Sequence, residues 1–397
     1  MSPRLHVVHV SRPVTEGTAV VALSYVRDQL ERGWNVTLVC PSDGWLGYAA
    51  RDLGARVRWW QARREPTRGV LGETLALRSI LAEHRPDVVH LHGAKAGLVG
   101  RLAVRGREVT FYQPHGWSFL AVEGRKADLA LRWERRSARW TDTVVCVSQD
   151  EQRLAGDHAI DAHTLVLPNG IDLTTWPPAA ASERAEARVE LDLPEGPLAV
   201  CVGRLSRQKG QHDLLDAWPE VRRAVPEATL VLVGDGPDRA ELEARAQELP
   251  GVRLVGARTD VRRWLVAADV VVAPSRWEGM ALVPLEAMAC ARSIVATRAV
   301  GVEETVPDGA GAVVDLEAPD DIAAALAHRL RHRDQADDEG LVGRAHVERG
   351  YDAATAAAEL SRVYLTRLAE RRQAPRSPRP GSGAGGGAGS AGSGRGS

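Results

Sequence analysis

Short apolar segments alternate with amphipathic, more polar segments along most of the chain. In the first half, runs rich in β-branched residues predict strands at 5–10, 36–40, 88–91, 109–112 and 143–147. The segments between them predict helices at about 19–32, 71–84, 95–105 and 126–140. Strands that alternate with helices in this way are typical of a parallel, doubly wound sheet.

The pattern starts again after residues 165–172, where the first half ends. A segment at 174–183 has adjacent prolines and small residues, which indicates an interdomain connector. Strands are then expected at 198–202, 229–233, 253–255, 270–272, 294–296 and 312–314, and closing helices at 321–331 and 353–370. We therefore predict two Rossmann-like α/β domains facing each other across a cleft, at 1–175 and 186–373, with a last helix able to pack back on the first. Residues 374–397 are mostly Gly, Ser, Pro and Ala, so a disordered tail is expected there.

Composition fits this two-domain prediction and excludes several classes of protein. The 397 residues are 44% hydrophobic and 26% charged, as in ordinary globular enzymes. A net charge of −1 gives no general attraction to nucleic acid. No apolar run reaches the roughly 18 residues of a membrane-spanning helix, and the first residues lack a signal-peptide core. The four cysteines are scattered and are expected to be reduced, buried thiols, which indicates a cytoplasmic protein.

The segment 270–297 carries two carboxylates at the carboxyl end of one predicted strand. Glu278 and Gly279 lie in the loop after the strand, and Pro284 suits the first turn of the next helix. We expect Glu286 in that same turn, near the positive end of the helix dipole. Eight residues span roughly 12 Å even in a helix. The two glutamates are therefore expected to bind opposite ends of an elongated ligand. Taken alone, Glu278 also suits a solvated loop, and Glu286 also suits favourable electrostatics at a helix end.

A second candidate site follows the strand at 198–202. The loop after Gly203 contains Arg204 and Lys209, and a helix is expected to begin near Gln211. Two cations beside backbone N–H groups at a helix N-terminus form a good diphosphate site. A solvated basic loop is the alternative, because short motifs of this kind also occur by chance.

Together these segments resemble glycosyltransferase family 4. The resemblance rests on Gly203-Arg204 with Lys209-Gly210, on 234–237 (GDGP), on 275–279 (SRWEG) and on 285–289 (LEAMA), and it extends over nearly the whole chain up to the tail. It implies a GT-B fold, a retaining mechanism, a nucleotide-sugar donor and no metal or other cofactor. It also implies an acceptor that is a sugar or a lipid-linked glycan.

The resemblance also implies roles for the matching residues. Arg204 and Lys209 would bind the donor diphosphate, Glu278 the donor sugar and Glu286 the ribose. The donor-binding set is Gly203, Arg204, Lys209, Glu278, Gly279, Met280, Ala281, Leu282 and Glu286. The catalytic residues would be His115, Glu278, Arg204 and Lys209.

In the first half, His115 follows a predicted strand and precedes Gly116. A lone histidine is more often structural, but the Pro-His-Gly pattern of the family implies contact with the donor sugar near the reacting carbon. Acceptor-side residues are expected at Gly17 and Thr18, and at His92 and Lys95. His90 and His92 share one face of their strand, but no nearby Asp, Glu or Cys completes a metal site, so no metal is predicted.

Three other segments have simpler interpretations. Ser148 and Glu151 are expected to form a capping box, and Asn169-Gly170 a tight turn. The segment 291–293 departs from the family pattern, which we interpret as structural. The loop at 300–302 also departs from it, a change that can alter backbone contacts to phosphate, and Glu304 beside it is expected to be solvated.

The stretch 124–140 combines six basic residues with Trp133 and Trp140. Such a helix can lie on an anionic membrane surface, and the alternative is a solvated face with ion pairs to Asp128 and Glu134. An anionic membrane surface is therefore a candidate partner, with a peripheral location at the inner face of the plasma membrane.

These features predict a glycosyltransferase that moves a hexosyl-type sugar from a nucleotide-sugar to an acceptor hydroxyl in cell-surface polysaccharide or glycolipid synthesis. Two alternatives remain: a GT-B-fold nucleotide-sugar epimerase, and a degenerate nucleotide-sugar-binding subunit.

Overall fold

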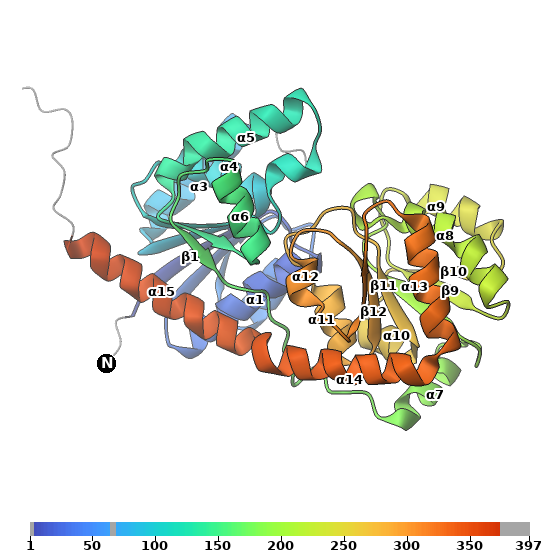
Figure 1. Ribbon diagram of the computed structural model, residues 1–397. Helices are drawn as coiled ribbons and strands as arrows, with labels where there is room; N and C mark the ends of the chain where they lie inside the picture. The colour runs from blue at the N-terminus through green and yellow to red at the C-terminus, as the bar shows by residue number, and fades with distance from the viewer. Residues whose placement is uncertain (1–3, 64–68, 374–397) are drawn as a thin grey trace, which may run out of the picture.

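The computed structural model describes residues 4–63 and 69–373 and contains two parallel β-sheets, one in each half of the chain (Figure 1). The predicted two-domain α/β fold is confirmed, with one sheet in each half of the chain. We call residues 1–175 the first domain and residues 186–373 the second domain, with the bounds that the sequence predicts. The predicted disordered tail, 374–397, lies outside the described residues.

The first sheet has the strand order β3-β2-β1-β4-β5-β6-β7. Its strands are β1 (His6–Ser11), β2 (Asn35–Cys40), β3 (Arg56–Trp59), β4 (Val88–His92), β5 (Val109–Gln113), β6 (Thr143–Cys146) and β7 (Thr164–Val166). Its helices are α1 (Glu16–Glu31), α2 (Leu46–Asp52), α3 (Val70–His84), α4 (Gly93–Val104), α5 (Arg125–Ser137) and α6 (Gln149–Asp157), with 3₁₀ turns η1 (Ser118–Ala121) and η2 (Ala138–Trp140). The valine-rich strands are buried because helices cover the sheet.

The second sheet repeats this topology in the order β10-β9-β8-β11-β12-β13. Its strands are β8 (Leu198–Val202), β9 (Thr229–Val233), β10 (Val252–Gly256), β11 (Val270–Ala273), β12 (Ser293–Thr297) and β13 (Gly311–Val314). Its helices are α7 (Ala181–Glu190), the 3₁₀ turn η3 (Arg207–Lys209), α8 (Gln211–Ala224), α9 (Arg239–Gln247), α10 (Val261–Ala267), α11 (Leu282–Ala289), α12 (Val302–Thr305), α13 (Pro319–Arg331) and α14 (Arg333–Gly350).

In each sheet the strand order reverses direction at one place. The first strand of the first domain, β1, lies between β2 and β4, and β8 in the second domain lies between β9 and β11. Open parallel sheets bind ligands beside the carboxyl ends of the strands at such a switch point. The loops after β8 and β11 carry the predicted donor residues, so the topology places them at the switch point of the second sheet.

The chain passes between the domains a second time near its end. Helix α14 packs against α11, and α15 (Ala353–Gln373) then extends along the first domain, where it contacts α1 (Figure 1). Leu360 and Tyr364 of α15 are fully buried there. The first domain is therefore completed by the last helix of the chain.

Several elements differ from the sequence prediction, each for a physical reason. Strand β3 (RVRW) is not predicted because it is an exposed edge strand without an apolar run. Strand β7 overlaps the start of the segment that was expected only to end the first half. Helix α14 contains two glycines that admit close packing, since a Cβ on Gly340 would lie 2.2 Å from the Ala291 carbonyl oxygen. The proposed connector at 174–183 overlaps α7, and the basic helix divides into α5 and η2.

Among the described residues, no helix is both long and apolar enough to cross a membrane. All four cysteines are free and buried, as predicted.

Candidate active site

The loop after β8 presents the two predicted diphosphate-binding cations next to the N-terminus of α8. Lys209 ends η3, and Gly210, the N-cap residue of α8, has a φ of +65°. A Cβ on Gly210 would lie 1.9 Å from the carbonyl oxygen of Pro274, so only glycine fits where this loop meets the loop after β11. The Arg204 side chain is partly exposed, and its backbone oxygen accepts a hydrogen bond from Gln211 Nε2 at 3.0 Å. Helix α8 therefore fixes the loop that carries the cations.

The loop after β11 brings Glu278 directly against this cation. Lys209 Nζ lies 2.5 Å from Glu278 Oε1, and Glu278 is 7% exposed. Gln208 joins the two loops, because its backbone oxygen accepts from Arg276 N and its Nε2 donates to the Trp277 oxygen. Arg276 also makes a bidentate ion pair with Asp213 of α8, at 2.6 and 2.9 Å. The structure thus places the predicted diphosphate and sugar residues in one site.

Glu286 lies on the same side, but not where the sequence placed it. Helix α11 begins at Leu282, so Glu286 is its fifth residue and belongs to the second turn, not the first. Pro284 is the third residue of the helix. Burial raises the pKa of Glu286 to about 7, and the positive charge of Lys209 acts in the opposite direction. A carboxyl group with a pKa this close to neutrality is typical of functional sites.

The two domains touch at paired glycines beside the predicted catalytic residues. A Cβ on Gly279 would lie 2.5 Å from Gly116 N and 2.8 Å from the His115 carbonyl carbon. Gly116 itself has a φ of +102° and faces Gly279 N. The backbone that follows Glu278 and the backbone that follows His115 can approach this closely only because neither glycine has a side chain.

Other contacts also join the two domains. Asn169 Nδ2 donates to the Met280 oxygen at 2.8 Å and so joins the domains, but the tight turn predicted at Asn169-Gly170 is wrong, because neither residue lies in a turn. Glu304 accepts from the backbone N–H groups of Gln149 and Asp150, both at 2.8 Å. The expectation that Glu304 is simply solvated is therefore wrong, because its carboxylate satisfies the N-terminus of α6 in the opposite domain.

His115 follows β5 in a strained backbone conformation, with a φ of +54°. Its side chain is partly exposed, and burial of the ring nitrogens lowers its pKa to about 3. The imidazole is therefore neutral at physiological pH, so it can orient a ligand by hydrogen bonding but cannot serve as a general acid. His115 lies at the boundary between the domains, next to Gly279. The contact with the donor sugar that the family resemblance implies stays a prediction.

A residue that the sequence analysis assigned elsewhere holds this loop. Glu151 is fully buried, and its two carboxylate oxygens accept from Gly116 N and Val147 N, each at 2.7 Å. Ser148 Oγ does cap α6 by accepting from Glu151 N, but the predicted capping box is wrong, since the Glu151 carboxylate binds these two other N–H groups. Nothing local in the sequence shows this, because Gly116 precedes Glu151 by 35 residues.

The four predicted acceptor-side residues fall into two groups. Gly17 and Thr18 are partly exposed near the start of α1, and a Cβ on Gly17 would lie 3.3 Å from the Leu282 side chain across the cleft. His92 is fully buried, and Lys95 is buried with its Nζ 2.6 Å from Glu73 Oε2. The enclosure of His92 and Lys95 does not support direct contact with an acceptor, whereas Gly17 and Thr18 remain well placed.

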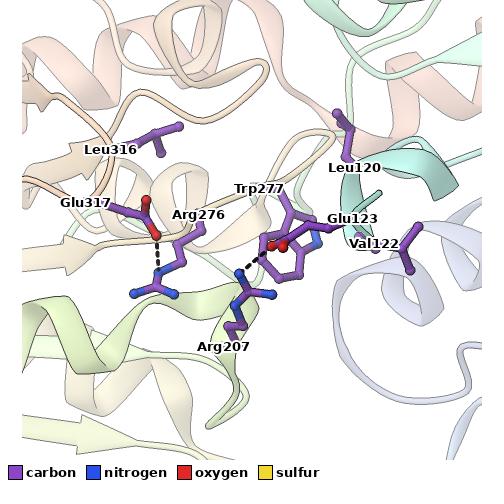
Figure 2. Close-up of a pocket in the computed structure, with 9 residues that line it drawn as sticks. Leu120, Val122, Glu123, Arg207, Arg276, Trp277, Leu316 and Glu317 are labelled. Atoms are coloured by element: carbon purple, nitrogen blue, oxygen red, sulfur yellow. Dashed lines mark hydrogen bonds and ion pairs between the residues drawn. The ribbon is translucent and has the colours of Figure 1, made fainter. Parts of the chain in front are cut away.

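A cavity of about 200 Å³ opens at the edge of the site, between the two domains. Figure 2 shows Leu120, Val122 and Glu123 on one side, facing Arg207 and Trp277 on the other. Arg207 Nη2 and Glu123 Oε1 are 2.6 Å apart, so this exposed ion pair spans the opening. Trp277, which lines the cavity, directly precedes Glu278 in the sequence. The lining therefore combines an aromatic ring with polar groups next to the predicted sugar-binding residue.

The departure from the family pattern at 291–293 lies away from these groups. Ala291 follows the end of α11, Arg292 is buried and donates to the Val266 oxygen, and Ser293 begins β12. This supports the structural interpretation. Within 300–302, Gly301 is the N-cap residue that precedes α12. A Cβ on Gly301 would lie 2.4 Å from the Gly279 oxygen.

The basic helix α5 lies on the outside of the first domain (Figure 1). Its cations are exposed, but the ion-pair alternative needs correction, because Glu134 is buried against Arg101 of α4 at 2.8 Å. Trp133 and Trp140 contact each other and are only partly exposed. Leu129, at 65% exposure, is the large apolar side chain that α5 presents to solvent.

Comparison with known proteins agrees with this architecture. Residues 16–170 match the family model described as "Glycosyl transferase 4-like domain", and residues 196–332 match "Glycosyl transferases group 1". A GDP-mannose-dependent alpha-(1-6)-phosphatidylinositol monomannoside mannosyltransferase of Mycobacterium tuberculosis is 34% identical over 354 residues, covering 83% of this chain and 89% of that protein. A UDP-Gal:alpha-D-GlcNAc-diphosphoundecaprenol alpha-1,3-galactosyltransferase of Escherichia coli is 27% identical, covering 72% and 77%.

Solved structures share the fold at lower identity. Anabaena HepE in complex with UDP-glucose has a TM-score of 0.79 at 20% identity, covering 91% of this chain and all of that one. Sucrose-phosphate synthase of Thermosynechococcus elongatus has a TM-score of 0.80 at 23% identity, covering 92% and 100%. The fold is therefore GT-B, and with a relative that is 34% identical over most of both chains, the protein belongs to glycosyltransferase family 4 and is a glycosyltransferase.

Proposed function

We propose that this protein transfers a hexosyl unit from a nucleoside-diphosphate sugar to an acceptor hydroxyl with retention of configuration and without a metal. The observation that carries the proposal is the contact between Lys209 and Glu278, at 2.5 Å, beside the N-terminus of α8. It joins a group suited to a diphosphate to a group suited to sugar hydroxyls. Glu286, on the next helix, is then available for the ribose.

In this mechanism the charge on the leaving diphosphate falls on Arg204, Lys209 and the backbone N–H groups at the start of α8. Glu278 holds hydroxyls of the donor sugar, and the neutral His115 contributes a hydrogen bond from the opposite domain. The acceptor hydroxyl attacks the anomeric carbon from the face that the diphosphate leaves, and its proton passes to a phosphate oxygen. No enzyme nucleophile is required.

We infer that the donor is GDP-mannose, because relatives that are 34% identical over most of this chain are named as GDP-mannose-dependent mannosyltransferases. A thermal-shift screen of UDP-, GDP-, ADP- and TDP-sugars tests this choice. A donor present at 100 times its Kd stabilises the folded protein by about 2.7 kcal/mol. A shift with another nucleotide and none with GDP-mannose would overturn the inference about the base while leaving the reaction class intact.

The substitution Glu278→Gln tests the assigned chemistry. It preserves side-chain volume but removes the charge that contacts Lys209 and the proposed sugar hydroxyls. We expect turnover to fall by about 10²–10³, as for other preorganised polar contacts, with an unchanged circular dichroism spectrum. Unchanged turnover would remove Glu278 from the mechanism.

The acceptor is proposed to be a sugar or lipid-linked glycan that reaches the site past Gly17 and Thr18 and the cavity beside Trp277. The exposed cations of α5 would hold the enzyme on an anionic membrane surface at the inner face of the plasma membrane, with Leu129 at the lipid boundary. Flotation with anionic vesicles tests this. Binding that is absent, or that survives replacement of Arg132 and Arg136 by Glu, would refute the membrane role.

The two alternatives, an epimerase and a binding subunit, differ from a transferase in one measurable respect. Only a transferase releases nucleotide in proportion to added acceptor. An epimerase changes the sugar with no acceptor, and a binding subunit gives a thermal shift without turnover. The intact set of Arg204, Lys209, Glu278 and Glu286 supports a transferase.

A further inference from the structure

Four histidines, with His115 at one end, lie close together in the first domain. His9 belongs to β1, His90 and His92 to β4, and His115 follows β5. His9, His90 and His92 are each fully buried, and the pairing of β1 with β4 sets His9 opposite His90. The rings of His90 and His92 stack with centroids 4.2 Å apart, and those of His92 and His115 lie 5.6 Å apart.

Three of these rings form a hydrogen-bonded series that ends at a glutamine. His115 Nε2 lies 3.3 Å from His92 Nδ1, and His92 Nε2 lies 3.0 Å from His9 Nδ1. His9 Nε2 then lies 2.9 Å from Gln29 Oε1 in α1. We call His115, His92, His9 and Gln29 the histidine series. His90 lies beside it but directs its Nδ1 to Tyr364 of α15.

Burial keeps the rings of this series neutral. It lowers the pKa of His9 to about 4 and that of His92 well below the usual value, and neighbouring histidines lower the latter further. A neutral imidazole has one N–H donor and one acceptor nitrogen. Each link in the series therefore uses one donor and one acceptor, and fixing the proton at one end fixes it in every ring.

A metal site is the competing explanation, because ligand nitrogens of His9, His90 and His92 all lie within 4.8 Å of one another. Ligand lone pairs lie in the ring planes and must converge on one point about 2.0 to 2.1 Å from each nitrogen. The three rings are stacked with interplanar angles of 13° to 28°, so their planes do not converge in this way. In addition, two of the nitrogens already face each other at 3.0 Å.

We propose that His92 is a positioning residue that, through His9 and Gln29, fixes the orientation and tautomer of His115. With Gln29 Oε1 as acceptor, the proton lies on Nε2 of His9, of His92 and of His115. His115 then keeps Nδ1 as an acceptor, suited to a sugar hydroxyl. The consequence for catalysis rests on the proposed transferase function, whereas the tautomer itself does not.

The tautomer is tested without substrate, by long-range ¹H–¹⁵N NMR of protein labelled with ¹⁵N-histidine. The 12 histidines are assigned with single His→Gln variants. We expect His115 to show one neutral tautomer, with Nδ1 unprotonated, between pH 5.5 and 8. The variant His92→Phe keeps a ring but removes both links, so the His115 signal should become a tautomer mixture. His90→Phe, from the same strand and equally buried, is the matched control and should leave the His115 signal unchanged.

A second variant guards against misfolding of His92→Phe. Gln29→Leu removes the acceptor at the far end of the series and should also release the tautomer of His115. With GDP-mannose as donor, both variants should lower kcat about tenfold or more while leaving the donor KM unchanged. His90→Phe should retain both constants.

Two results would overturn the proposal. One is a His115 tautomer that is the same in wild type, His92→Phe and Gln29→Leu. The other is stoichiometric zinc, found by elemental analysis and lost in both His9→Phe and His90→Phe. A fixed tautomer in a protein that transfers no sugar would refute the proposed function and leave the series intact, so the two failures are distinguishable.

Discussion

Replacing Gly279 by alanine should push the two domains apart at the point where they meet. The added Cβ would lie 2.5 Å from Gly116 N, about 0.9 Å inside the 3.4 Å at which ordinary contact begins. The two nearest atoms, Gly116 N and the His115 carbonyl carbon, belong to the backbone. Rotation of a side chain therefore cannot relieve the clash with them, and the loop carrying His115 must withdraw. A misplacement of about 1 Å at a reacting centre typically costs about 10²-fold in rate. We therefore expect kcat to fall by about this factor.

The assay compares steady-state turnover, donor affinity by calorimetry and the radius of gyration by small-angle scattering. Because Gly279 itself belongs to the predicted donor-binding set, the donor Kd is measured beside kcat. A fall in kcat that exceeds the rise in Kd reports the displaced His115 loop rather than weaker donor binding. The control is Gly72→Ala in α3, where a Cβ meets nothing within 4 Å. A Gly279→Ala protein with the turnover and radius of the wild type would show that this close approach is not needed for catalysis.

Three further outcomes follow from other contacts. Because the pKa of Glu286 is raised to about 7, its ionised fraction rises from about 9% at pH 6 to about 91% at pH 8. Donor affinity measured by calorimetry should therefore rise about tenfold over this range and become independent of pH in Glu286→Gln; the same pH dependence in the variant would contradict the ribose role. Lys209→Met should lower kcat by about 10²–10³ in a nucleotide-release assay, and a loss below tenfold would exclude Lys209 as the main contact to the leaving group. Arg101→Leu leaves the buried Glu134 carboxylate without its cation and should lower the free energy of unfolding by about 3–5 kcal/mol in urea titrations. The double variant Arg101→Leu/Glu134→Leu should recover much of this stability, and a loss under about 1 kcal/mol in the single variant would contradict the reasoning.

The layout of the second domain's site was easier to predict from sequence because its residues lie in loops after two buried strands that are neighbours in the sheet, β8 and β11. Arg204, Lys209 and Glu278 each follow an apolar run directly, so the parallel topology alone brings them to one edge of the sheet. The register of α11 was predicted less well. Pro284 does lie in the first turn, as expected, but as its third residue, so Glu286, two residues later, falls in the second turn.

The first domain was predicted less completely, because its polar partners are far apart in the chain. Glu151 was assigned to a local cap, but it binds Gly116, 35 residues earlier. His9 lies within a strand that reads as apolar, and its partner His92 comes 83 residues later. No short-range pattern reports such pairs, since strand order alone decides which residues become neighbours.

The position of α15 has a consequence for the order in which the protein can fold during its synthesis. The first domain needs Leu360 and Tyr364 to cover it, yet these residues are translated after the entire second sheet. At about 5–20 residues per second, roughly 10–40 s separate the completion of residue 175 from that of α15. During this time the surface under α15 is bare on the nascent chain. A fragment that ends after the first sheet should therefore aggregate, and chaperone binding to stalled chains should persist until α15 has left the ribosome.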